Sequence, residues 1–129
     1  MSSTLTVTNL TATNLTDGGS TTSTFADINK GRSQCWVNFT GTSTVNIEDS
    51  LNTSSITDNS TGRYEANQTN NFANANYCIT HNGLLAAGNG WFASYFDKTT
   101  ANVELLFITT LGAYADCADV SVTYNGVLA

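Results

Sequence analysis

The polar part of this chain consists of hydroxyl and amide side chains rather than charges, and this limits its fold more than any other feature. Thr, Asn and Ser supply 22, 16 and 12 of the 129 residues, whereas charged residues supply 11%. Thr favours pleated strands, while Asn, Ser and Gly favour turns, so the bias predicts sheets with many connections. Proline is absent, so Gly, Asn and Asp must form the turns. The 40% of hydrophobic residues is enough for one core at this length.

Short runs of alternating apolar residues, each bounded by turn signals, predict strands. Cys35, Val37 and Phe39 fall on one face of the first run, and Val45 and Ile47 on one face of the second. The expected strands cover residues 35–40, 44–48, 63–68, 76–80, 91–96, 102–109 and 119–124. We therefore expect an all-β fold over residues 32–129, either an antiparallel β-sandwich or a jelly-roll-like domain.

Residues 1–31 differ from the rest because they carry a five-residue repeat. Leu5, Leu10 and Leu15 are each followed by Thr. Side chains alternate along a strand, so leucines five residues apart form no apolar face on a single chain. Around a threefold axis with two further copies, or docked on a partner, they would be buried. We expect an extended segment that anchors the chain or holds a homotrimer together, with a disordered Thr-rich tail as the alternative.

The charge pattern argues against nucleic-acid binding. The chain has a net charge of −6, and its four cations, Lys30, Arg32, Arg63 and Lys98, are dispersed. Phosphate backbones are bound by clustered positive charge, which this sequence lacks. The apolar runs are too short to span a bilayer, and the first residues lack the regions of a signal peptide. We expect no membrane insertion and no secretory export.

The three cysteines, Cys35, Cys78 and Cys117, lie roughly forty residues apart. Such spacing does not fit a disulfide framework or a CxxC metal site. We expect buried thiols that pack as small apolar groups, and one disulfide with one free thiol is the alternative.

Catalytic chemistry finds little support in the sequence. The single histidine, His81, is expected in a turn, and no nucleophile motif accompanies it. The carboxylates Glu48–Asp49, and the pair Asp116 and Asp119, could cleave a glycosidic bond only if the fold held two of them across a cleft. We therefore expect no enzymatic activity, no cofactor and no metal.

Residues 82–100 are the best candidate for a recognition surface, because they are rich in Gly and aromatic residues and poor in charge. Aromatic rings pack on the apolar faces of sugars, and amides hydrogen-bond their hydroxyls. This makes Asn82, Asn89, Trp91 and Tyr95 candidates for glycan contact. The alternation of aromatic residues over 91–96 equally describes a strand buried on both faces, inside the domain or at a subunit interface, and we favour burial.

Several short motifs resemble a domain found near the C-termini of phage tail-fibre and other virion proteins. The family reads approximately as a WVNF-G-T opening, a DS-N turn, an SSITDNGTG-Y hairpin and an ANY strand start. The matching stretches of this chain are residues 35–42, 47–52, 54–64 and 72–77, and residues 119–126 match more loosely. The repeat in residues 1–31 is also similar to the shaft repeats of phage fibres.

The resemblance implies a bacteriophage virion structural protein, exposed on the virion surface as a β-rich homotrimer and assembled in the host cytoplasm. Its role would be attachment to host-surface glycan, with other capsid or tail proteins as partners. Here the tip-like domain follows only about thirty residues, whereas tail fibres have a long shaft. A capsid decoration protein with an architectural role is therefore the alternative, and a glycan-cleaving enzyme is a minor one.

Overall fold

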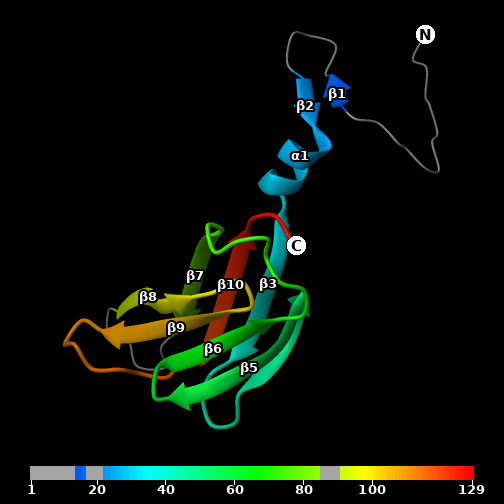
Figure 1. Ribbon diagram of the computed structural model, residues 1–129. Coiled ribbons are helices and arrows are strands. Elements are labelled where there is room, and N and C mark those ends of the chain that lie inside the picture. Colours follow the sequence, from blue (N-terminus) through cyan, green and yellow to red (C-terminus); the bar gives the residue numbers. More distant parts are fainter. Residues whose placement is uncertain (1–13, 17–21, 85–90) are drawn as a thin grey trace, which may run out of the picture.

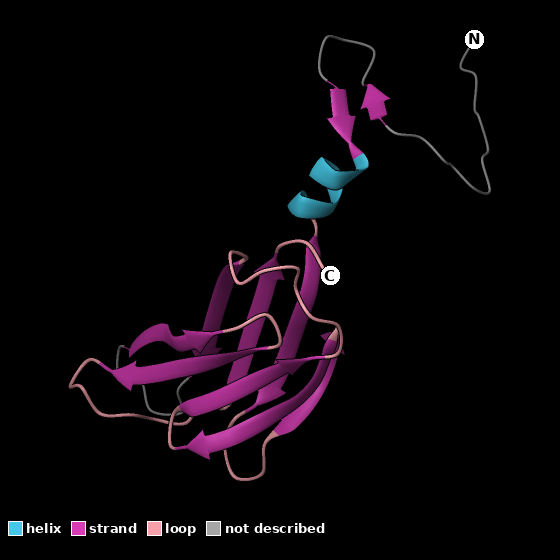
Figure 2. Cartoon of the chain, in the orientation of Figure 1, coloured by secondary structure: helices cyan, strands magenta, loops and turns pink. Residues whose placement is uncertain are grey.

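The computed structural model describes residues 14–16, 22–84 and 91–129, and it shows a β-sandwich (Figures 1 and 2). One sheet, here called the β3 sheet, has the strand order β4-β3-β10-β7. Its strands are β3 (Ser33–Thr40), β4 (Asn46–Leu51), β7 (Cys78–Leu84) and β10 (Asp119–Asn125). The other, the β6 sheet, has the order β5-β6-β9-β8. Its strands are β5 (Thr53–Ser60), β6 (Arg63–Gln68), β8 (Trp91–Lys98) and β9 (Asn102–Thr109). All pairings are antiparallel, so the predicted all-β sandwich is confirmed.

The core lies between the two sheets and follows the predicted alternation. Cys35, Val37 and Phe39 of β3 are buried, and every second residue of β9 is buried opposite them. Val45 and Ile47 are partly buried against this core, as expected. Aromatic rings join the layers, since the ring of Tyr64 on β6 lies 5.3 Å from that of Phe39 and 5.9 Å from that of Phe107 on β9.

The segment before the sandwich is not extended throughout. It contains a short hairpin of β1 (Asn14–Thr16) and β2 (Thr22–Thr24), followed by the helix α1 (Phe25–Gly31). Figure 1 shows these elements projecting from the end of the sandwich at which the C-terminus lies. The expectation of a wholly extended segment is therefore wrong for residues 25–31. Asp27 in the first turn and Lys30 in the last turn suit the helix dipole. In the described residues, no helix is long and apolar enough to cross a membrane.

Five of the seven predicted strands differ from their predicted bounds by one to four residues, whereas β6 and β9 match theirs. β5 was not among the strands predicted by alternation, because its sequence is polar and only Thr53 and Ile56 are buried or packed against the core. β7 continues to Leu84, so His81 lies within a strand and the predicted turn at His81 is wrong. The hairpin that the resemblance implied over residues 54–64 is formed by β5 and β6, and its turn consists of Thr61 and Gly62.

The three cysteines are free. Cys35 and Cys117 are buried as expected, and Cys35 Sγ lies 3.5 Å from Thr53 Oγ1. Cys78 is exposed at the start of β7, so the expectation of burial is wrong for this thiol. It occupies the first position of an edge strand, where side chains of the outer face meet solvent.

Candidate functional site: an amide-lined pocket beside α1

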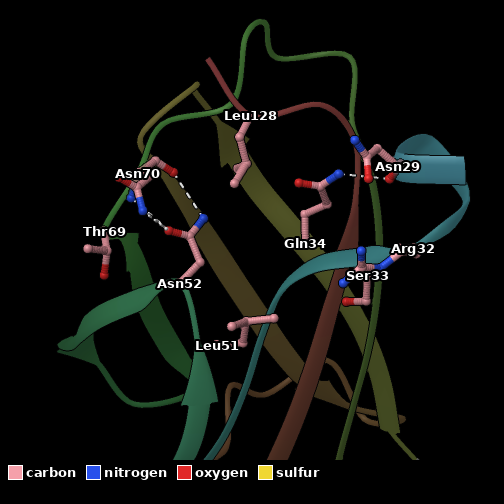
Figure 3. A pocket seen from close by; sticks show the side chains of 9 residues that line it. All are labelled: Asn29, Arg32, Ser33, Gln34, Leu51, Asn52, Thr69, Asn70 and Leu128. Carbon is pink, nitrogen blue, oxygen red and sulfur yellow. Dashed lines mark hydrogen bonds between the residues drawn. The ribbon is translucent and has the colours of Figure 1, made fainter. Parts of the chain in front are cut away.

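A pocket of about 390 Å³ opens where α1 meets the sandwich (Figure 3). Four parts of the chain meet there: the residues from α1 into β3, the β4–β5 corner, the residues after β6, and the C-terminal residues. Its lining consists of amides, hydroxyls, one cation and two leucines: Asn29, Arg32, Ser33, Gln34, Leu51, Asn52, Thr69, Asn70 and Leu128. The volume lies at the lower end of the range of about 300–1,000 Å³ that is typical of ligand sites.

One wall of the pocket is held by a reciprocal amide pair between Asn52 and Asn70. Asn52 Oδ1 accepts hydrogen bonds from the Asn70 backbone N–H at 2.8 Å and from Asn70 Nδ2 at 3.0 Å. Asn52 Nδ2 donates in return to the Asn70 carbonyl at 3.0 Å. Asn52 has a φ of 60°, which lets the chain turn sharply from β4 to β5. Asn tolerates this left-handed conformation better than most residues. Asn52 therefore forms both the sharp β4–β5 corner and this wall of the pocket.

The opposite wall carries Gln34 and Arg32. Gln34 Nε2 donates to the Asn29 carbonyl at 2.8 Å. Figure 3 shows the carboxamide oxygen of Gln34 on the side away from Asn29, toward Asn52 in this view. The Arg32 guanidinium is exposed and has no side-chain hydrogen bond or ion pair within the described part of the chain. Of the described residues that line the pocket, Arg32 is charged and none is a carboxylate, although the chain is acidic.

This arrangement can bind a polar solute, and its lining among the described residues lacks a pair of carboxyl groups. The pocket has amide donors and acceptors, hydroxyls and a cation, with Leu51 and Leu128 as apolar surfaces. Glycosidases require two carboxyl groups across the substrate. The predicted carboxylates lie elsewhere and are engaged locally: Asp116 Oδ1 accepts from the Gly62 N–H at 2.7 Å, and Asp119 Oδ1 accepts from Asn38 Nδ2 at 2.6 Å. Among the described residues, no cluster of His, Cys, Asp and Glu could hold a metal ion.

His81 is enclosed between the sheets. Its ring hydrogen-bonds to the backbone of Ser94 and meets the ring of Phe107 edge-on, with centroids 5.8 Å apart. Burial lowers the pKa of His81 below its ordinary value, because the charged imidazolium would lose its hydration. Its Nε2 atom is buried and has no hydrogen-bond partner among the residues described. His81 therefore packs as a partly buried, neutral residue on the edge strand β7.

The predicted glycan contacts do not form one surface. Asn82 faces outward on β7 in the β3 sheet, where it lines a shallow pocket of about 150 Å³ together with Asp119 and Ser121. Tyr95 lies on β8 in the β6 sheet, and its ring centroid is 5.5 Å from Lys98 Nζ. Trp91 is the first residue of β8, and Asn89 lies outside the described residues.

The strand at 91–96 is not buried inside the domain. Phe92, Tyr95 and Phe96 are 64%, 47% and 68% exposed. Burial of Phe92 and Phe96 within the domain was therefore a wrong expectation, and burial at a subunit interface stays a prediction. Of the repeat leucines, Leu5 and Leu10 lie outside the described residues, and Leu15 belongs to β1, where its backbone pairs with Ser23.

Sequence reasoning missed the pocket. Arg32 was read only as one of four dispersed cations, and Asn52 only as part of a turn motif. The one sequence signal for the pocket was Asn52 in the turn motif of residues 47–52. The residues around Asn52 in the sequence do not indicate that Asn70 or Leu128 lies beside it. Comparisons of the chain with protein-family models, with curated proteins and with solved structures found no match.

Proposed function

We propose that the chain is a structural protein of a tailed-bacteriophage virion, a short trimeric fibre-like surface appendage that binds host-surface glycan. The observation that carries the glycan-binding role is the amide-lined pocket beside α1. The virion context and the trimer rest on the motif resemblance described above. The projection of β1, β2 and α1 from one end of the sandwich also suits an appendage, because it leaves the sandwich at the tip of a stalk.

The chemistry of the pocket fits a sugar better than an apolar ligand. Sugars present many hydroxyls, and the amides of Gln34, Asn29 and Asn70 supply both donors and acceptors for them. Leu51 and Leu128 supply surfaces for the apolar C–H faces of a sugar ring. Arg32, which has no side-chain partner among the described residues, adds a preference for a carboxylated or phosphorylated sugar, since guanidinium groups bind such anions in a bidentate manner.

A single pocket of this size gives weak binding, and the proposed trimer compensates for it. Three pockets that engage one polysaccharide surface at once can raise the overall affinity by about 10²–10⁴ without any new contact. Such an attachment protein would bind tightly to a cell with many copies of the glycan on its surface and would release free sugar fragments readily.

Glycan binding can be tested on arrays of neutral and acidic bacterial polysaccharides, followed by calorimetry with a bound fragment. We expect Arg32→Gln to weaken binding of an acidic fragment about tenfold or more, because it removes the only cation of the pocket. Lys30→Gln is the matched control, because it removes the same charge two residues away without lining this pocket. Absence of binding to every glycan, or equal affinity of Arg32→Gln and the parent, would refute the proposal.

A capsid decoration role is the second candidate. The exposed aromatic residues of β8 favour it if they pack on a capsid protein instead of on another copy of this chain. Electron cryomicroscopy of virions decides between the roles. Density on the capsid lattice would support decoration, and density at the tail would support an attachment fibre.

A further inference from the structure

The outer side of the β6 sheet carries an apolar surface that the domain does not cover. Phe92 and Phe96 of β8, Leu106 and Ile108 of β9, and Tyr114 form this surface, here called the β8 face. Phe92 pairs across the strands with Ile108, and Ile108 forms a bridge to Tyr114. Phe92, Phe96 and Tyr114 are 64%, 68% and 52% exposed. Isolated exposed apolar residues are common, but a contiguous cluster on one sheet face marks an interaction surface.

Charged residues border only one end of the β8 face. At the Phe96 end, Arg63 forms an ion pair with Glu104 at 2.7 Å and lies 5.0 Å from the ring centre of Phe96, while Glu65 and Asp97 stand opposite Glu104 on the neighbouring strands. At the other end, the described strand positions around Phe92 and Ile108 carry no charged side chain. Two copies of an acidic chain repel each other, so the uncharged Phe92 end is where they can approach most closely.

The chemistry of the face suits a protein rather than a sugar. The side chains of Phe92, Phe96 and Ile108 have no polar group, and the face adds only the hydroxyls of Tyr114 and of Ser94, which lies 3.5 Å from the Tyr95 carbonyl. A sugar bound here would lose hydration of most of its hydroxyls and gain few partners, which is unfavourable. An apolar protein surface has no such cost.

The area of the face is consistent with a specific interface. With about 150–250 Å² for each aromatic side chain, the exposed fractions of the three rings correspond to about 350 Å² per copy. A standard interface takes about 800 Å² from each partner. In a trimer each subunit contacts two neighbours, so the rings would supply about a fifth of each contact as its apolar centre, and Leu106, Ile108 and the polar margin would supply part of the rest.

We infer that the β8 face is where copies of this chain contact one another, with Phe92 and Phe96 buried between neighbouring subunits around the threefold axis. This inference rests on the trimer of the proposed function. It locates the subunit contact on the sandwich itself, on the strand whose aromatic residues are left exposed by the described part of the chain.

The test compares the molar mass of three proteins at about 10 µM by sedimentation equilibrium. The parent should have three times the 13.7 kDa chain mass. The double variant Phe92→Ser/Phe96→Ser should fall to the mass of one chain while keeping its β-sheet circular dichroism. The control Leu84→Ser/Val127→Ser removes two other exposed apolar side chains and should remain trimeric. Phe92→Glu adds one repelling charge per copy and repeats the test if the double variant does not fold.

The outcomes separate this inference from the proposed function. A parent and a double variant that are both trimeric would overturn the inference and leave the trimer intact. A monomeric parent would overturn both. A parent dimer that the double variant dissociates would support the contact face and refute the threefold assembly.

Discussion

Replacing Tyr64 by Phe removes one hydroxyl from the centre of the core, and the structure predicts a large loss of stability. Tyr64 is fully buried on β6. Its hydroxyl donates to the Gly41 carbonyl at 2.7 Å, accepts from the Cys117 N–H at 3.3 Å, and lies 3.1 Å from Asp116 Oδ1. Burial raises the pKa of Tyr64 above its ordinary value, so the hydroxyl stays protonated. It therefore connects β6 to the two loops that lead into β4 and β10 of the opposite sheet.

The magnitude follows from the groups left behind. In Tyr64→Phe, the Gly41 carbonyl and the Cys117 N–H lose this partner in a buried place, and each such group costs about 1–3 kcal/mol. We expect the free energy of unfolding to fall by about 2–4 kcal/mol. For a domain of this size, that corresponds to a decrease in Tm of about 8–15 °C.

Tyr124→Phe provides a matched control with the opposite expectation. Tyr124 is equally buried, and its ring lies 6.0 Å from that of Tyr77, yet its hydroxyl has no hydrogen-bond partner in the part of the chain described. Removing a buried hydroxyl without a partner leaves nothing else unsatisfied and relieves a desolvation cost. We expect unchanged stability or a gain of about 1 kcal/mol.

Thermal and urea unfolding, followed by circular dichroism, measure both variants. The two substitutions delete the same atom at the same burial, so they differ only in hydrogen bonding. If Tyr124→Phe destabilises as much as Tyr64→Phe, or if Tyr64→Phe costs less than about 0.5 kcal/mol, the reasoning from hydrogen bonds is wrong.

Three further predictions follow from buried or strained groups. The pKa of His81 is lower in the folded than in the unfolded state, so the unfolded state binds more protons as the pH falls. The free energy of unfolding should therefore be at its full value above about pH 6.5 and decline below it. In His81→Gln, the urea midpoint should depend less on pH between pH 7 and 5, and an unchanged pH dependence would contradict this. Burial raises the pKa of Cys117 to about 11 and also raises the pKa of Cys35. A thiol reagent at pH 8 should therefore label only the exposed Cys78 of the native protein. Rapid labelling of all three cysteines would show that Cys35 and Cys117 are not buried. Asn52→Ala should destabilise more than Asn52→Gly by about 1 kcal/mol in thermal unfolding, because Gly tolerates the positive φ; equal losses would show that the amide pair alone matters.

The fold could be predicted from sequence where alternation is strong. In β3 and β9, every second residue is apolar and buried, so period-two patterning alone places the strands and their inner faces. Alternation missed β5 because it is an edge strand in which Ile56 is the one apolar residue packed against the core and the buried Thr53 is polar, so its two faces carry no alternation signal. α1 was missed because seven residues are too few to show a helical stripe.

The pocket could not be predicted, because its parts are brought together only by the sandwich. Asn52 and Asn70 are eighteen residues apart, and the hairpin of β5 and β6 places them side by side. Gln34 and Leu128 reach the same end from opposite ends of the domain. On β8 the sequence showed aromatic residues on both faces, but alternation cannot tell a strand covered by its own chain from one covered by another subunit.

The pocket and the β8 face share no residue, and this makes the two proposed roles separable by experiment. The pocket is built from α1, the β4–β5 corner and the residues after β6, whereas the face belongs to β8, β9 and Tyr114. Phe92→Ser/Phe96→Ser should therefore leave the affinity for a soluble monovalent fragment unchanged. The same variant should lose about 10²–10⁴ in apparent affinity for an immobilised polysaccharide, because only a trimer engages several sites at once. Arg32→Gln should instead lower the affinity for an acidic fragment while the molar mass of the protein stays unchanged. A double variant that loses fragment binding as well would show that the pocket needs the neighbouring subunit, and the two surfaces would then form one site.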